Sequence, residues 1–368
     1  MKEFEKVIAK WPKEDFGAQA RNEACTIYWR LGQTEKWAAH MDYLATGEYK
    51  DSQNLRQLSQ RRFVMHRLTE KKIAEAYALV TPGKAKDPLV TFAEWTAEDF
   101  KPENIPTIYG DKGKKALPAI AADAVAFIEK QAPQMADPSQ KTAVPPLCAR
   151  IYARGGVADK AKERYTALIK ESPDNDTIRK EYGDLLRETG ARADARLVYH
   201  ELKNQYAGDT EIAETYGEEN NWKSAAEPYQ TMLGKYADKA GIIQWRLGEA
   251  LEREGKLQEA IAAFQQSQRE PQSLFRIAEC QGTMKQHDAA IQTLVGVLNF
   301  FKPSAAEAQY RMSAHYAAKG DKEAAINSLK TVCKVYLSSP WAGKAHQDLA
   351  QLYGVDVTLG GAAKKNEK

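Results

Sequence analysis

Apolar and polar residues alternate with a helical period in two segments that align with each other, residues 243–271 and 307–336. In each segment the pattern runs up to a glycine, Gly255 or Gly320. A helix is expected to end there, because glycine readily adopts the left-handed conformation at a helix exit. A turn and a second helical pattern follow in both segments. Each segment therefore predicts two antiparallel helices joined by a short turn.

The second predicted helix of both segments carries a small residue and, four positions later, a bulky one. These pairs are Ala260 with Phe264 and Ala325 with Leu329. A small residue lets two helices approach closely, and a bulky one fills the space toward the next hairpin. Gly248 is expected to provide a further close approach, in the first helix of residues 243–271.

The same spacing recurs in other segments, which makes the chain an internal repeat. The further pairs are Ala161 with Tyr165, Ala195 with Tyr199, Ala225 with Tyr229 and Ala290 with Leu294. The pattern resembles the tetratricopeptide repeat, whose period is about 34 residues. This resemblance implies an all-α fold, a right-handed α-solenoid of antiparallel helix hairpins, and an interaction scaffold with a concave groove.

The pattern divides the chain into four parts. Residues 1–80 predict divergent N-terminal hairpins, and residues 81–113, which contain prolines and glycines without a helical period, predict a long loop or insert. Residues 114–355 predict an array of about six hairpins and a final helix. Residues 356–368 predict a flexible charged tail.

The first twelve residues look like the second helix of a hairpin whose first helix is missing. We therefore expect the chain to be a fragment of a longer protein. A lone helix that caps the array is the alternative, because terminal repeats are often atypical. Gly32, which precedes a turn and a new helical pattern, is expected to be a helix-exit glycine like Gly255.

Composition restricts the partners. The chain has 53 basic and 50 acidic residues and a net charge of +3, which argues against nucleic acid as the main partner, because phosphate binding needs a concentrated basic face. The sequence has no apolar run of the ~20 residues that a membrane span needs.

The sequence offers no catalytic motif, phosphate loop or metal-ligand spacing, so we expect neither an enzyme nor a cofactor. We expect buried free thiols, with a disulfide or a metal role as the alternative, at Cys25, Cys148, Cys280 and Cys333.

Three successive repeats carry an aromatic residue, an arginine, an apolar residue and a small one. Aromatic residues beside arginines are typical of protein-binding hot spots. The family resemblance places the aromatic on the concave groove, so we predict partner binding there. The alternative is that the aromatics pack between neighbouring first helices and the arginines pair with glutamates. The predicted partner-binding residues are Trp245, Arg246, Glu249, Arg253, Phe275, Arg276, Glu279, Tyr310 and Arg311.

Residues 6–29 and 334–354 also resemble the repeats of bacterial envelope-assembly and cell-division coordinators. This resemblance favours the bacterial periplasm or envelope, although the sequence leaves the compartment open. The predicted function is a non-enzymatic scaffold that binds a protein or peptide segment. A self-associating structural protein and a non-catalytic part of a larger enzyme or complex are the alternatives.

Overall fold

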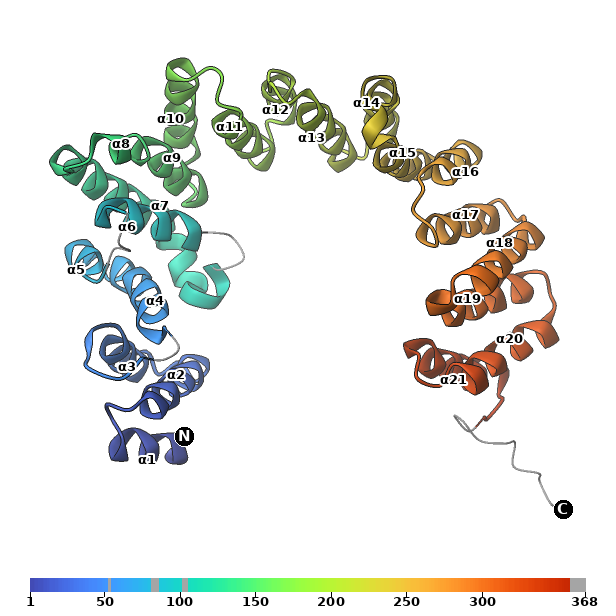
Figure 1. The fold of residues 1–368 in the computed structure, drawn as a ribbon, viewed down its shortest axis with the longest axis horizontal. Coiled ribbons are helices and arrows are strands. Elements are labelled where there is room, and N and C mark those ends of the chain that lie inside the picture. Colours follow the sequence, from blue (N-terminus) through green and yellow to red (C-terminus); the bar gives the residue numbers. More distant parts are fainter. Residues whose placement is uncertain (52–53, 81–85, 101–104, 358–368) are drawn as a thin grey trace. The chain divides into compact units, whose positions relative to one another are not determined.

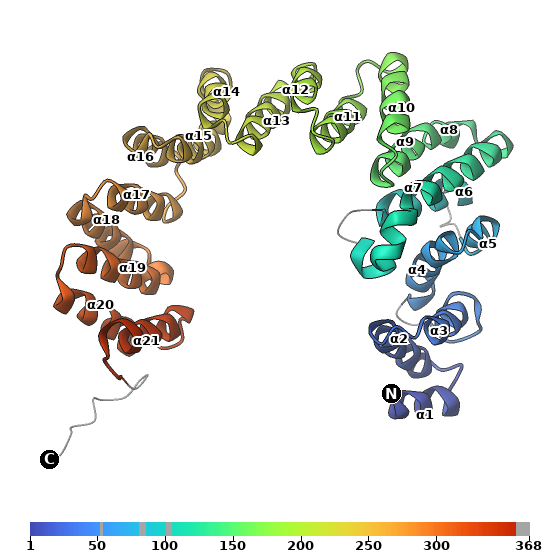
Figure 2. The ribbon, with the colours of Figure 1, turned by 180° about the vertical axis from the view of Figure 1, so that it is seen from behind.

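The structure, a computed structural model, describes residues 1–51, 54–80, 86–100 and 105–357, except for the side chains of residues 105–114. Every regular element in these ranges is a helix, as Figure 1 and the opposite view in Figure 2 show. The chain forms two compact units, Met1–Val198 and Tyr199–Lys368. The all-α helical-repeat fold predicted from the sequence is confirmed.

Unit 1 is a succession of helices in which most elements pack against the next one along the chain. It contains α1 (Lys2–Lys10), α2 (Asp15–Arg30), α3 (Thr34–Thr46), α4 (Leu55–Thr69), α5 (Ile73–Ala78), α6 (Pro88–Asp99), α7 (Ile105–Gln131), α8 (Pro138–Lys141), α9 (Val144–Arg154), α10 (Ala158–Glu171) and α11 (Asp176–Glu188). Helix α12 (Arg192–His200) contains the boundary between the units.

Unit 2 repeats one arrangement, in which the two helices of a hairpin pack against each other and the second helix packs against the first helix of the next hairpin. Its helices are α13 (Gln205–Glu218), α14 (Trp222–Lys235), α15 (Ala240–Glu254), α16 (Leu257–Gln266), α17 (Gln272–Thr283), α18 (His287–Phe300), α19 (Ala305–Ala318), α20 (Lys322–Val335) and α21 (Pro340–Tyr353).

The repeat positions predicted from the sequence hold these hairpins together. In α16, Ala260 and Phe264 are both fully buried. A Cβ atom at Gly248 would lie 2.7 Å from Cε1 of Phe264, so only glycine leaves room for this ring between α15 and α16. Gly255 has φ +89° and ends α15, as a left-handed exit residue should. Gly32, with φ +68°, lies just past the end of α2 as predicted.

The prediction of a long loop at residues 81–113 is wrong in the part of this segment that the structure describes. Residues 88–99 form α6, and α7 begins at Ile105. The Asp87 side chain caps α6 by accepting a hydrogen bond from the Leu89 amide at 2.8 Å. The sequence shows no helical period in this segment, because α6 is buried on most of its surface and therefore lacks a polar face. Residues 81–85 and 101–104, and the predicted tail from residue 358, lie outside the described residues.

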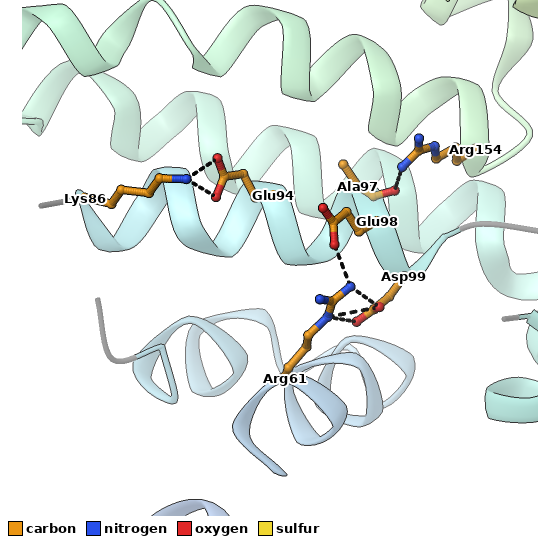
Figure 3. A network of polar contacts seen from close by, with 7 residues as sticks. All are labelled: Arg61, Lys86, Glu94, Ala97, Glu98, Asp99 and Arg154. Atoms are coloured by element: carbon orange, nitrogen blue, oxygen red, sulfur yellow. Dashed lines mark hydrogen bonds and ion pairs between the residues drawn. The ribbon is translucent and has the colours of Figure 1, made fainter. Parts of the chain in front are cut away.

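Polar contacts fix α6 between its neighbours in unit 1, as Figure 3 shows. Arg61 of α4 pairs with Glu98 at 2.8 Å and with Asp99 at 2.7 Å. Arg154 of α9 donates a hydrogen bond to the carbonyl oxygen of Ala97. The end of α6 is therefore held from two sides by arginines of other helices.

The four cysteines are buried, as the sequence predicted. Burial raises the pKa of Cys25, Cys148 and Cys280 to about 12. No helix in the described part of the chain is both long and apolar enough to span a membrane.

Candidate partner-binding face

The nine predicted partner-binding residues lie on three first helices of unit 2. We call the surface that they form the ladder face. Helix α15 contributes four of them, α17 three and α19 two. Adjacent residues of a helix do not face each other, and the aromatic rings meet arginines of other segments, as where Arg311 of α19 lies 4.9 Å from the Phe275 ring of α17. The residues are Trp245, Arg246, Glu249 and Arg253 on α15, Phe275, Arg276 and Glu279 on α17, and Tyr310 and Arg311 on α19.

The aromatic residues of the ladder face are engaged in packing to different degrees. Phe275 is only 8% exposed and belongs to the hydrophobic core between α17, α18 and α19. Trp245 is half-buried, and its ring centroid lies 5.3 Å from that of Phe264. Tyr310 donates a hydrogen bond of 2.7 Å to Asp348 of α21. Most of the area of Phe275 is therefore unavailable to a partner.

Two of the arginines form ion pairs between neighbouring hairpins. Arg276 of α17 pairs with Glu252 of α15, and Arg311 of α19 pairs with Glu279 of α17. Arg311 also pairs with Glu307 at 2.6 Å. These pairs join three successive first helices and give this part of the face a fixed arrangement of charge.

The surroundings of these arginines stabilise their charged forms. Burial acts to lower the pKa of Arg276, but the hydrogen bond and the charge of Glu252 outweigh it, and the pKa is raised. The same balance raises the pKa of Arg311, where Glu279 and Glu307 supply the opposing effect. Both guanidinium groups therefore remain charged throughout the physiological pH range.

Arg246 differs from the other two arginines because its ion pair is local and exposed. Among the residues that the structure describes, its carboxylate partner is Glu249 on the same helix, at 3.4 Å, and its side chain is 49% exposed. Arg246 and Glu249 line an open pocket of about 360 Å³ between α13, α14 and α15. We call it the Arg246 pocket.

The remaining walls of the Arg246 pocket come from the preceding hairpin. Trp222 and Tyr229 of α14 provide aromatic surface, and Glu214 of α13 provides a further carboxylate. The guanidinium group of Arg253 lies 5.7 Å from the Trp222 ring. Sequence reasoning assigned Tyr229 to the repeat motif alone and selected neither Trp222 nor Glu214 as a binding residue. The pocket arises only when the hairpins stack.

The structure offers no metal centre within the residues that it describes. No group of three or more histidine, cysteine, aspartate or glutamate side chains is arranged there to hold a metal ion. Two histidines, His287 and His315, lie side by side, with their Nδ1 atoms 3.4 Å apart.

Comparisons with known proteins identify the repeat. Residues 149–210 and 210–273 each match the family model described as tetratricopeptide repeat. No curated protein sequence matches the chain.

Solved structures of helical-repeat proteins are similar to the chain over part or most of its length. A MamA protein matches with 19% identity and a TM-score of 0.37, covering 50% of this chain and 97% of that one. YrrB, a tetratricopeptide-repeat protein, matches with 19% identity and a TM-score of 0.36 over 50% and 97% of the two chains. A Naa15/Naa10 complex bound to HypK matches with 13% identity and a TM-score of 0.42 over 90% and 64%.

Proposed function

Since residues 149–210 and 210–273 match the tetratricopeptide repeat, the architecture of protein–protein interaction scaffolds, we propose that the chain binds a segment of a partner protein on the ladder face without catalysing a reaction. The segment enters the Arg246 pocket and continues along the first helices of unit 2. Trp245, Arg253 and Glu279 are the further contacts that we assign to it.

The observation that carries this proposal is the Arg246 pocket. It is open, it has a volume of about 360 Å³, and it combines aromatic surface with a half-exposed arginine and glutamate. A pocket with a few oriented polar groups on apolar walls is the usual form of a recognition site. The interhelical ion pairs of Arg276 and Arg311 support it, because a surface that is already ordered loses less entropy when a partner binds.

A charge-swapped variant tests the proposal without removing the local ion pair. The double substitution Arg246→Glu with Glu249→Arg retains one charge of each sign three positions apart and reverses their positions in the pocket. The matched control adds the same pair of charges to the exposed surface of α16, as Gln258→Arg with Ala262→Glu. Both variants should melt like the wild type when followed by circular dichroism.

Partner capture from a lysate of the source organism, followed by calorimetry with the recovered partner, gives the readout. We expect the wild type and the α16 control to bind the partner equally and the charge-swapped variant to bind at least about tenfold more weakly. Equal affinity in all three proteins would contradict binding at the Arg246 pocket.

Self-association is the second candidate function, and exposed apolar side chains near the last helix of unit 2 favour it. Leu352 is 68% exposed, Val335 is 61% exposed and Leu337 is 49% exposed. Exposed apolar side chains that lie near one another offer a surface that a second copy of the chain can cover. A sedimentation coefficient that rises with concentration in the wild type, and not in Leu352→Glu, would support this function.

A role in bacterial envelope assembly is a narrower form of the scaffold proposal. It rests only on the resemblance of residues 6–29 and 334–354 to the repeats of envelope-associated proteins. Fractionation of source cells into periplasm, membrane and cytoplasm, followed by immunoblotting for this chain, tests it directly. Recovery from the cytoplasm alone would contradict it.

A further inference from the structure

Unit 1 contains a second and larger pocket, which the sequence did not indicate. It has a volume of about 570 Å³ and lies among α2, α3, α4 and α6. We call it the Trp29 pocket. Its apolar lining is Cys25, Trp29, Trp37, Met41, Leu58 and Met65.

The walls of the Trp29 pocket combine a fixed base with an accessible mouth. Met41 and Met65 are at most 1% exposed, whereas Leu58 is 43% exposed. The rings of Trp29 and Trp37 lie 5.1 Å apart and are tilted by 55°. Aromatic and thioether side chains offer a large and adaptable contact area for an apolar group that enters between them.

Three arginines line the same pocket, and of these only Arg61 has a carboxylate partner among the residues that the structure describes. Arg61 is neutralised by Glu98 and Asp99, and Figure 3 shows its guanidinium group directed toward these side chains. Arg62 makes a single hydrogen bond, of 3.4 Å, to the neutral side chain of Asn22. Arg30 is exposed and has no ion pair with any residue that the structure describes.

Within the described part of the chain, the lining therefore presents two positive charges without a carboxylate partner, Arg30 and Arg62, beside an apolar cavity. A lysine-rich segment would be repelled there, and an apolar segment without charge would leave both arginines unmatched. A ligand with a carboxylate next to a large apolar side chain matches both the arginines and the apolar cavity. Arginine binds carboxylates through paired hydrogen bonds, and the apolar side chain fills the cavity.

We propose that the Trp29 pocket binds a peptide segment of a partner protein in which a leucine or phenylalanine is flanked by aspartate or glutamate. The apolar side chain occupies the space between Trp29, Met41 and Met65. The flanking carboxylates pair with Arg30 and Arg62. The site lies wholly in unit 1, and it does not depend on the function proposed for unit 2.

Synthetic peptides with fluorescent labels test this specificity on the full chain. The first is an octapeptide with Leu-Phe at its centre, three aspartates before it and three after it. The second replaces the aspartates by lysines, and the third replaces Leu-Phe by Ala-Ala. Fluorescence anisotropy gives the affinities, and quenching of tryptophan emission reports contact with Trp29 and Trp37.

We expect the first peptide to bind at least about tenfold more tightly than the other two, and we expect salt to weaken its binding. Equal binding of the lysine peptide would overturn the charge argument, and equal binding of the alanine peptide would overturn the apolar one. Absence of binding by the first peptide would overturn the proposal. Binding of dodecanoate in its place would show that the occupant is an anionic amphiphile.

Two substitutions locate the binding and leave the buried base of the pocket intact. Leu58→Glu places a negative charge at the mouth, and its matched control, Gln57→Glu, adds the same charge at the neighbouring exposed position. Arg62→Gln removes one uncompensated charge, and Lys36→Gln is its control. We expect only Leu58→Glu and Arg62→Gln to weaken the binding of the first peptide, by about tenfold or more.

The charge-swapped variant at Arg246 separates this proposal from the function proposed for unit 2. It should bind the first peptide with wild-type affinity. If that variant lost binding of the first peptide while Leu58→Glu retained it, the peptide would bind at the Arg246 pocket, and the proposal for the Trp29 pocket would be refuted.

Discussion

Gly248 provides the sharpest test of how the repeats of unit 2 are held together. In an open helix interior, replacing glycine by alanine stabilises a protein by up to about 1 kcal/mol, because alanine has the higher helix propensity. At Gly248 the new methyl group would lie 2.7, 2.8 and 3.1 Å from three ring atoms of Phe264. We therefore expect Gly248→Ala to destabilise the chain.

The magnitude follows from how little Phe264 can move. Its side chain is fully buried in α16, and the Trp245 ring packs against it. Overpacking a closed site costs about 1–3 kcal/mol, which exceeds the gain in helix propensity of about 1 kcal/mol. The net effect of Gly248→Ala should be a loss of about 0–2 kcal/mol. A domain of this size then melts several degrees lower, at about 2–4 °C per kcal/mol.

Gly296 of α18 is the matched control for this prediction. It also lies inside a helix, but no heavy atom would lie within 4 Å of a methyl group there. Gly296→Ala should therefore raise the melting temperature by a few degrees, as expected for a gain of up to about 1 kcal/mol. Thermal melts followed by circular dichroism at 222 nm, a wavelength that reports the helices, compare both variants with the wild type.

A double-mutant cycle with Phe264→Leu identifies the physical cause. Leucine lacks the outer ring atoms that meet the new methyl group, so Gly248→Ala should cost at least about 1 kcal/mol less in that background. The steric explanation is wrong if Gly248→Ala and Gly296→Ala raise the melting temperature of the wild type equally. It is also wrong if Phe264→Leu leaves the effect of Gly248→Ala unchanged.

Three further predictions concern the ion pair, the histidines and the thiols. Asp99→Ala should cost about 1–3 kcal/mol in urea unfolding, because it leaves the part-buried Arg61 with Glu98 alone, whereas the exposed Glu98→Ala should cost less than about 1 kcal/mol. Burial and the neighbouring His287 lower the pKa of His315. The unfolded chain therefore binds more protons just below pH ~6.5, so the melting temperature should fall as the pH drops through that value, and less steeply in His315→Gln. A thiol reagent should react slowly with the native chain and rapidly after unfolding, because the four cysteines are buried; fast labelling of the native chain would contradict this burial.

The repeat could be predicted from the sequence because its determinants are local. Ala260 and Phe264 are four positions apart on one helix, and Gly255 ends the preceding helix by its own conformational freedom. Helix α6 escaped prediction because burial on nearly all sides removes the alternation of polar and apolar residues that reveals a helix. The Pro88 that suggested a loop instead occupies the start of this helix, where proline is well tolerated.

The candidate site could be predicted only in part. The sequence located the aromatic and arginine residues of three consecutive first helices, and the structure places them on α15, α17 and α19. The sequence also left open whether the arginines face a partner or neighbouring glutamates. The structure pairs Arg276 and Arg311 with glutamates of other helices and leaves Arg246 half-exposed. Their role in partner binding stays a prediction.

The sequence by itself determined the helical repeat, the close approach at Gly248 and the burial of the cysteines. These follow from side-chain volume and backbone freedom at fixed spacings along the chain. Only the tertiary structure decided which charges are neutralised and where cavities remain. The Trp29 pocket draws its lining from α2, α3, α4 and α6, segments separated by up to 74 positions between Cys25 and Asp99. An ion pair or a pocket depends on distances between helices, and spacing along a single helix does not specify them.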